Sequence, residues 1–142
     1  MEDAPRRTPE ASLKEVFLKA SEAFPEERER AEVVGEALDF LQRGFDAHYD
    51  NSGRGSASDD DILVGDNDYA WAVETIARLD EPRFVTVASR MIRDGSGRIS
   101  SGANVALELW TPHLAGLLDV ISGEGQQRSE ERIRAAAAEV SS

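Results

Sequence analysis

The chain of 142 residues contains no cysteine, and this absence removes several kinds of chemistry at once. Disulfides, thiolate catalysis and zinc sites with cysteine ligands are all excluded. Histidine is also scarce, since it occurs only as His48 and His113. Neither histidine belongs to a Glu-x-x-His pair, so a carboxylate-bridged di-iron bundle is not supported either. We therefore expect no metal and no cofactor.

Long apolar runs are missing as well. No segment approaches the roughly 20 apolar residues that a membrane-spanning helix needs. The first ten residues, MEDAPRRTPE, have no apolar stretch after their charges, whereas a signal peptide would have one. These observations predict a cytoplasmic protein that does not contact a membrane.

The charges are of unequal number and unevenly placed. The net charge is −12, and the bases are 14 arginines and only 2 lysines. Residues 1–71 hold 18 acids and 8 bases, for a net charge of −10, while residues 72–142 hold 10 acids and 8 bases. Such a negative field repels phosphates, so direct binding of nucleic acid is not expected. A simpler explanation of the composition is that an acidic, lysine-poor surface keeps a protein solvated in a salty cytoplasm.

Residues 66–92 are predicted to form the helical hairpin around which the rest of the chain is built. Asp66 or Asp68 caps its first helix, and Trp71 is assigned to the core with the apolar residues that follow at helical spacing. Asp80 caps the second helix, in which Pro82 occupies the first turn.

Residues 84–87, Phe-Val-Thr-Val, leave an alternative open. They are rich in strand-forming side chains, and Asp94-Gly95 could turn a β-hairpin back through Arg98 and Ile99. The helical pattern of residues 84–92 is favoured over this strand.

Two amphipathic helices are predicted before the hairpin. Residues 1–7 are expected to be disordered, and Thr8 is expected to cap a helix that ends at Phe24. Pro25 begins a second helix, which extends to about His48. Residues 49–65 have no helical period and are predicted to form a long acidic loop.

Residues 93–142 show further helical patterns. The glycines at 95 and 97 predict a turn, after which Ser100 or Ser101 caps a helix that kinks or breaks at Thr111-Pro112. A last helix is predicted from Ser129 to about Val140. The predicted fold class is all-α: residues 8–140 form a single-domain helical bundle of about six helices, with the long acidic loop at 49–65.

A cluster of arginines is the pattern that most resembles a binding site. Residues 83–98 contain four arginines and one acid, and Ser100 follows at the predicted start of the next helix. Guanidinium groups near a helix N-terminus suit a phosphate or a carboxylate. The candidate anion-binding residues are therefore Arg83, Arg90, Arg93, Arg98 and Ser100. A structural alternative is that these arginines pair with acids between Glu26 and Glu36.

Residues Asp50 to Asp61 have the length of a calcium-binding loop, with Gly55 at the sixth place. Arg54 places a cation where an oxygen ligand should be, and Asp61 is shorter than the usual bidentate glutamate. A solvated acidic loop is therefore preferred to a calcium site.

No nucleophile elbow, phosphate-binding loop or zinc-protease motif occurs, so no catalytic residue is assigned and a non-enzyme is favoured. The leading hypothesis is a non-catalytic acidic protein-interaction module, an inhibitor or adaptor, that acts on a basic protein surface. Its candidate partner-binding residues are Glu26, Glu29, Glu36, Asp59, Asp60 and Asp61. The alternative is a small anionic ligand-binding protein or enzyme subunit that uses the arginine cluster. The oligomeric state is left open.

Overall fold

The computed structural model describes residues 11–53, 59–100 and 107–141, and these residues are almost entirely helical. No strand occurs in these ranges, so the predicted all-α bundle is confirmed and residues 84–87 belong to a helix. The elements are α1 (Leu13–Ser21), the short 3-10 helix η1 (Pro25–Glu27), α2 (Arg28–Gly53), α3 (Asp59–Ala77), α4 (Pro82–Ser100), α5 (Leu107–Ser122) and α6 (Gln126–Ser141).

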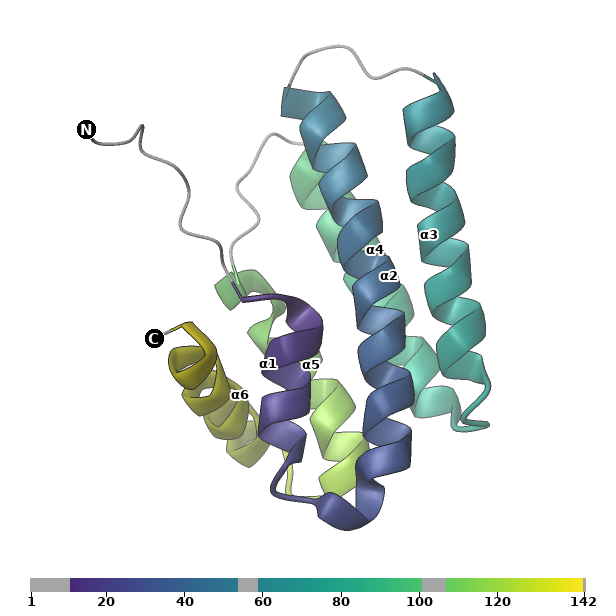
Figure 1. Cartoon of the computed structure of the whole chain (residues 1–142). Coiled ribbons are helices and arrows are strands. Elements are labelled where there is room, and N and C mark those ends of the chain that lie inside the picture. The colour runs from purple at the N-terminus through teal and green to yellow at the C-terminus, as the bar shows by residue number, and fades with distance from the viewer. Residues whose placement is uncertain (1–10, 54–58, 101–106, 142) are drawn as a thin grey trace, which may run out of the picture.

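Helix α2 is the centre of the fold. It packs against α1, α3, α4 and α5, while α3 lies along one side of it and α6 lies at the opposite side of the molecule (Figure 1). The prediction that the 66–92 hairpin is central is wrong, because α3 packs far more extensively on α2 than on α4. The reason is the wide buried face of α2, which comprises Ala31, Val34, Gly35, Ala37, Leu38, Leu41, Gly44 and Phe45.

Helix α1 begins later than predicted. Ser12 is its cap, since its hydroxyl accepts from the backbone N–H of Glu15 at 3.0 Å and the Glu15 carboxylate accepts from the Ser12 N–H at 3.1 Å. This reciprocal pair satisfies two donors that the first turn leaves free. The N–H of Leu13 donates to Gln42 Oε1 at 2.8 Å and so ties the helix start to α2. The predicted cap Thr8 and residues 1–7 lie outside the described ranges.

The long acidic loop at 49–65 is helical at both ends. Helix α2 continues to Gly53 and α3 begins at Asp59, while residues 54–58 lie outside the described ranges. Asp59, Asp60 and Asp61 occupy the first turn of α3. Asp66 and Asp68 therefore lie inside α3 and do not cap it.

Helix α4 begins at Pro82, as predicted, but its capping carboxylate belongs to Glu81. The backbone N–H of Arg83 donates to Glu81 Oε2 at 3.1 Å. Asp80, the predicted cap, instead has a left-handed backbone with a φ of 56°. It ends the turn between α3 and α4, and the next residue makes the capping contact.

The Gly95-Ser96-Gly97 segment is helical and not a turn, because α4 extends through it to Ser100. Gly95 is buried against the rings of Phe45 and Trp110, which stack with their centroids 4.6 Å apart. This contact between α4, α2 and α5 extends the helix past the glycines. Ser100 is therefore the last residue of α4 and does not cap α5.

The C-terminal part of the chain holds two helices, and the alternative cap Ser101 lies outside the described ranges. Helix α5 passes through Pro112 without a break, and Gly123 and Gly125 form the following turn with φ values of 70° and 99°. Helix α6 begins at Gln126, three residues before the predicted start at Ser129, and docks on α1 and α5 of its own chain. No helix in the described part of the chain is both long and apolar enough to cross a membrane.

Candidate functional site

The predicted arginine cluster lies along α4, but its members do not converge. Arg83 lies in the first turn of the helix, where its Nε and Nη2 donate to the two oxygens of Glu81 at 3.1 and 3.0 Å. These bonds, together with that from the Arg83 backbone N–H, lower the pKa of Glu81 to about 2. Arg83 thus belongs to the start of the helix and lies far from Arg98, near the other end.

The other candidate anion-binding residues also lie apart from one another. Arg90 is exposed on α4, and Ser100 ends that helix. The structural alternative, in which these arginines pair with acids between Glu26 and Glu36, is wrong for Arg83, which pairs with Glu81, and for Arg93, whose acid is Asp94. Their positions on α4 place acids of the same helix or of the preceding turn within reach.

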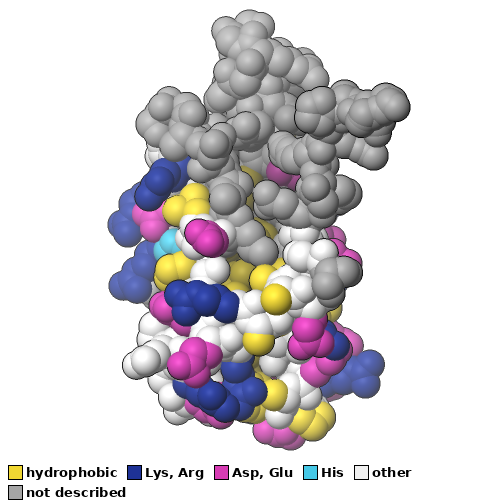
Figure 2. Space-filling view, turned by 90° about the vertical axis from the view of Figure 1, so that its left-hand side faces the viewer, with side chains coloured by type: hydrophobic (Ala, Val, Ile, Leu, Met, Phe, Trp, Pro, Cys, Tyr) yellow, Lys and Arg dark blue, Asp and Glu magenta, His cyan; other side chains and the backbone are white. Residues whose placement is uncertain are grey.

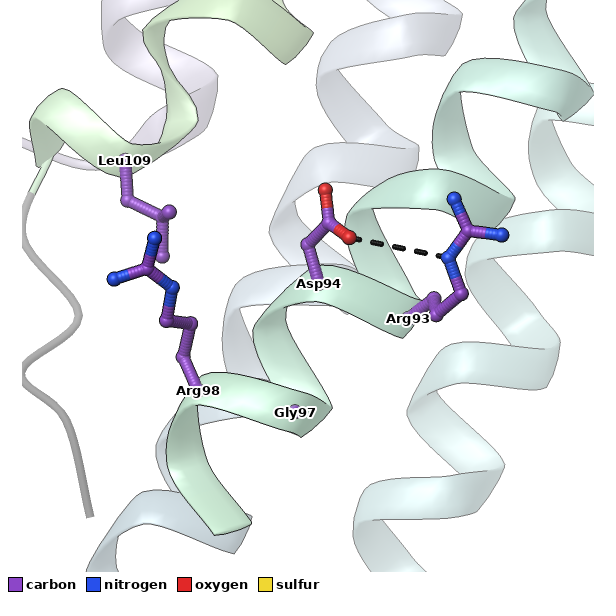
Figure 3. A pocket seen from close by; sticks show the side chains of 5 residues that line it. All are labelled: Arg93, Asp94, Gly97, Arg98 and Leu109. Carbon is purple, nitrogen blue, oxygen red and sulfur yellow. Dashed lines mark ion pairs between the residues drawn. The ribbon is translucent and has the colours of Figure 1, made fainter. Parts of the chain in front are cut away.

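Arg93 and Arg98 do line a common pocket. It is open, encloses about 490 Å³, and is bounded by Arg93, Asp94, Gly97 and Arg98 of α4 and by Leu109 of α5. Figure 3 shows the two arginines on either side of Asp94, with Arg98 extending towards Leu109. Of the five residues predicted to bind an anion, the fold brings these two to one pocket.

Sequence reasoning missed the residue that holds Asp94. His113 of α5 lies with Nε2 3.0 Å from Asp94 Oδ2, while the other carboxylate oxygen is 3.9 Å from Arg93 Nε. The histidine and the aspartate are 19 residues apart, and no spacing rule connects them. Only the packing of α5 on α4 brings the pair together.

The candidate partner-binding acids form two separate groups. Glu26 in η1 and Glu29 and Glu36 in α2 are exposed. Residues 59–61 start α3 and so lie beside the other end of α2, because α2 and α3 are antiparallel neighbours (Figure 1). Glu26 and Glu29 therefore lie at one end of the α2–α3 pair and residues 59–61 at the other, with Glu36 between them, so these acids do not make one continuous site.

Between these ends lies an aromatic surface that the sequence analysis assigned to the core. Trp71 is 51% exposed and stacks on Phe40 of α2 at a centroid distance of 6.3 Å. The guanidinium carbon of Arg43 lies 4.7 Å from the centre of the Phe40 ring. We call Phe40, Arg43 and Trp71, with the exposed Glu36 and Glu74 beside them, the Trp71 surface.

The spacing along α3 contains the signal that could have placed Trp71 correctly. At about 100° per residue, Trp71 is roughly 200° around the helix from Tyr69 and 140° from Ile76. Tyr69, Ile76 and Thr75 are buried, so Trp71 lies at the edge of the buried face, where it still contacts Phe40 of α2. The prediction that Trp71 belongs to the core was based on the apolar character of its side chain alone.

The face that includes α6 has a different character. Acidic and cationic side chains are interspersed on it, with no large area of one sign (Figure 2). Helix α6 contributes ion pairs between Arg132 and Glu124 at 2.7 Å and between Arg134 and Glu130 at 3.2 Å. Charges on this face therefore neutralise one another locally.

The described residues contain no group of three or more histidine or acidic side chains that could hold a metal ion. The twelve residues compared above with a calcium loop are not one loop, since Asp50 to Gly53 continue α2 and residues 59–61 begin α3.

Two surfaces thus remain as candidates for function. The Trp71 surface lies on α2 and α3, and the pocket with Arg93 and Arg98 lies between α4 and α5. Comparisons of the chain with protein-family models, with curated proteins and with solved structures found no match, so these two surfaces carry the functional argument.

Proposed function

We propose that this protein is a non-catalytic interaction module, an inhibitor or adaptor, that binds a basic protein surface through the Trp71 surface. The observation that carries this proposal is the exposure of Trp71, the one large hydrophobic side chain so exposed among the described residues. Tryptophan and arginine are enriched among the residues that dominate binding energy at protein interfaces. A tryptophan left half in solvent is the natural anchor for a partner's apolar pocket.

The support beneath Trp71 favours this role. Phe40, on which the indole stacks, is only half-buried and packs against the hydrophobic core through its inner side. The stacking limits the rotamers of Trp71 before a partner arrives, and such pre-organisation reduces the entropy lost on binding. The indole is therefore both accessible and held in place.

The charges around the aromatic pair favour a basic partner. Glu36 precedes Phe40 by four residues and Glu74 follows Trp71 by three, so each lies next to an aromatic ring on its own helix. Within the described part of the chain neither carboxylate forms an ion pair. On the partner, lysines or arginines around the pocket that accepts the indole would form ion pairs with both carboxylates. A second copy of this chain fits poorly, because two such acidic surfaces repel each other.

The acids at the two ends of the α2–α3 pair extend this field. Glu26 and Glu29 lie at one end and residues 59–61 at the other. A surface that carries charges of one sign raises the rate of encounter with an oppositely charged partner. Added salt screens the charges and removes this effect. These acids would accelerate association, while Trp71 would provide most of the affinity.

The test begins with a tagged pull-down of the full chain from its native cytosol at low and high salt, read by mass spectrometry. A partner counts only if wild type retains it and Trp71→Ala does not, with both proteins equally helical by circular dichroism. With that partner purified, calorimetry should show a loss of about 2 kcal/mol or more for Trp71→Ala, as for an interface hot spot.

A matched pair of charge variants completes the test. The double variant Glu36→Gln/Glu74→Gln should weaken binding and flatten its salt dependence, whereas Glu131→Gln on α6 should change neither. Equal capture by wild type and Trp71→Ala, or an affinity that salt leaves unchanged, would exclude the proposed function.

A further inference from the structure

The pocket between α4 and α5 is a second candidate site, independent of the Trp71 surface. We infer that it binds a small organic anion with one carboxylate and an apolar body. Its volume of about 490 Å³ lies within the range of about 300–1,000 Å³ that is usual for small-molecule sites. Its lining combines two guanidinium groups with one apolar wall, which is the chemistry that such a ligand needs.

Gly97 is an exposed residue of the pocket lining. A side-chain carbon there would meet no atom within 4 Å, whereas one at Gly95 would collide with Phe45 and Trp110. Close packing thus explains why residue 95 is a glycine, but it does not explain the glycine at residue 97. At both positions glycine weakens the helix relative to alanine. The pocket is thus open beside residue 97.

Arg93 has hydrogen-bond donors that Asp94 does not use. Arg93 is 76% exposed and approaches Asp94 only through Nε, at the long distance of 3.9 Å. Figure 3 shows both of its Nη atoms turned away from Asp94. Asp94 is held through its other oxygen by His113. An incoming carboxylate would accept from the Nη groups of Arg93 while the pair between Asp94 and His113 stays in place.

The remaining lining limits the ligand. Arg98 extends towards Leu109, so a cationic and an apolar group share one wall (Figure 3). The carboxylate of Asp94 already lies between the two arginines (Figure 3). In a chain of net charge −12, this favours a singly charged carboxylate over a dianionic phosphate.

The test is an NMR titration of the ¹⁵N-labelled full chain with 3-phenylpropanoate. Saturable shifts of the amides of residues 93–98 are expected, with weaker or no binding of 3-phenylpropanol, which lacks the charge, and of phenyl phosphate, which is dianionic. Arg93→Gln and Arg98→Gln should each weaken binding roughly tenfold, as expected for the loss of a charge-assisted hydrogen bond. Arg90→Gln, on the same helix outside the pocket, should bind as wild type does.

Filling the pocket provides a separate control. Gly97→Leu should abolish binding and Gly97→Ala should retain it, with helicity measured for both variants. The inference is overturned if 3-phenylpropanoate causes no saturable shift, if the alcohol or the phosphate binds equally well, or if Arg90→Gln loses as much affinity as Arg98→Gln. If Gly97→Leu does not fold, the arginine variants decide alone. None of these residues belongs to the Trp71 surface, so the outcome is independent of partner binding.

Discussion

Gly95 lies so close to Phe45 that a side-chain carbon at this position would be 2.5 Å from Cε1 of the phenyl ring. The same carbon would be 2.6 Å from Cη2 of Trp110. Residues of three helices thus meet at a point where only a hydrogen atom fits, and α4 approaches the stacked rings through its backbone. Gly97, two residues later, faces open space.

Alanine substitutions at these two glycines should therefore have opposite effects. Gly95→Ala forces the rings apart, and overpacking of this kind lowers the free energy of unfolding by about 1–3 kcal/mol. Gly97→Ala only restricts the unfolded chain and should raise the free energy of unfolding by about 0.5–1 kcal/mol. Urea unfolding followed by circular dichroism measures both. Equal changes in the two variants would contradict the close packing at Gly95.

Two buried serines provide a second matched pair. Ser129 is fully buried, and its Oγ has no hydrogen-bond partner among the described residues, whereas Ser21 Oγ donates to the Leu18 carbonyl at 2.9 Å. Ser129→Ala removes an unsatisfied group and should raise the free energy of unfolding by roughly 1 kcal/mol. Ser21→Ala breaks a bond and should lower it by about 0.5–1.5 kcal/mol. Thermal unfolding of both variants tests this, and a less stable Ser129→Ala would show that its hydroxyl is satisfied after all.

Glu81 should make stability depend on pH in the acidic range. Its pKa is lowered to about 2 in the folded protein, chiefly by the bonds from the Arg83 side chain, against about 4.3 when unfolded. A carboxyl group whose pKa is lower in the folded than in the unfolded protein stabilises the fold at pH values above its unfolded pKa. This stabilisation is lost as the pH falls towards its folded pKa. Wild type should therefore be more stable than Glu81→Gln at pH 7, and their melting temperatures should converge between about pH 4.3 and 2.

A comparison with Arg83→Gln checks the assigned cause. This variant removes the side-chain donors but leaves the backbone N–H that also bonds to Glu81. It should therefore lose part of the pH-dependent stability and not all of it. A melting difference between wild type and Glu81→Gln that stays constant from pH 7 to 2 would contradict the lowered pKa.

The two tryptophans should differ in their access to solvent. Trp71 is 51% exposed and Trp110 is 5% exposed. Acrylamide should therefore quench Trp110→Phe, which retains Trp71, much more than Trp71→Phe, which retains Trp110. The quencher must be neutral, because a net charge of −12 would repel iodide. Similar quenching of the two variants would remove the basis of the Trp71 surface.

Alanine substitution of the same two tryptophans should distinguish a surface side chain from a side chain that packs in the core. Trp110 stacks on Phe45 inside the core, so Trp110→Ala should lower the free energy of unfolding by about 3–5 kcal/mol. Trp71→Ala should lower it by clearly less, since half of the indole is already in solvent. Chemical unfolding of the two variants decides this, and a loss at Trp71 as large as that at Trp110 would identify Trp71 as a core residue.

Local patterns predicted the helix class. The apolar spacing from Leu13 to Ala20 and the prolines at 25 and 82 act within one or two helical turns, and the structure agrees with them. Arg93 and Arg98 line one pocket, because arginines that are close in one helix remain close in space. The exposure of Trp71 could have been read from its angle to Tyr69, but its apolar character received more weight.

The sequence by itself determined that this chain forms helices, because the periods and proline positions that specify helices act over a few residues. Only the tertiary structure decided which helix is central and where α4 ends. Gly95 and Gly97 favour a turn in isolation, but the contact of Gly95 with Phe45 and Trp110 keeps that segment helical. The pair between His113 and Asp94 likewise depends on how α5 packs on α4. Such contacts join residues far apart in the chain, and no local propensity encodes them.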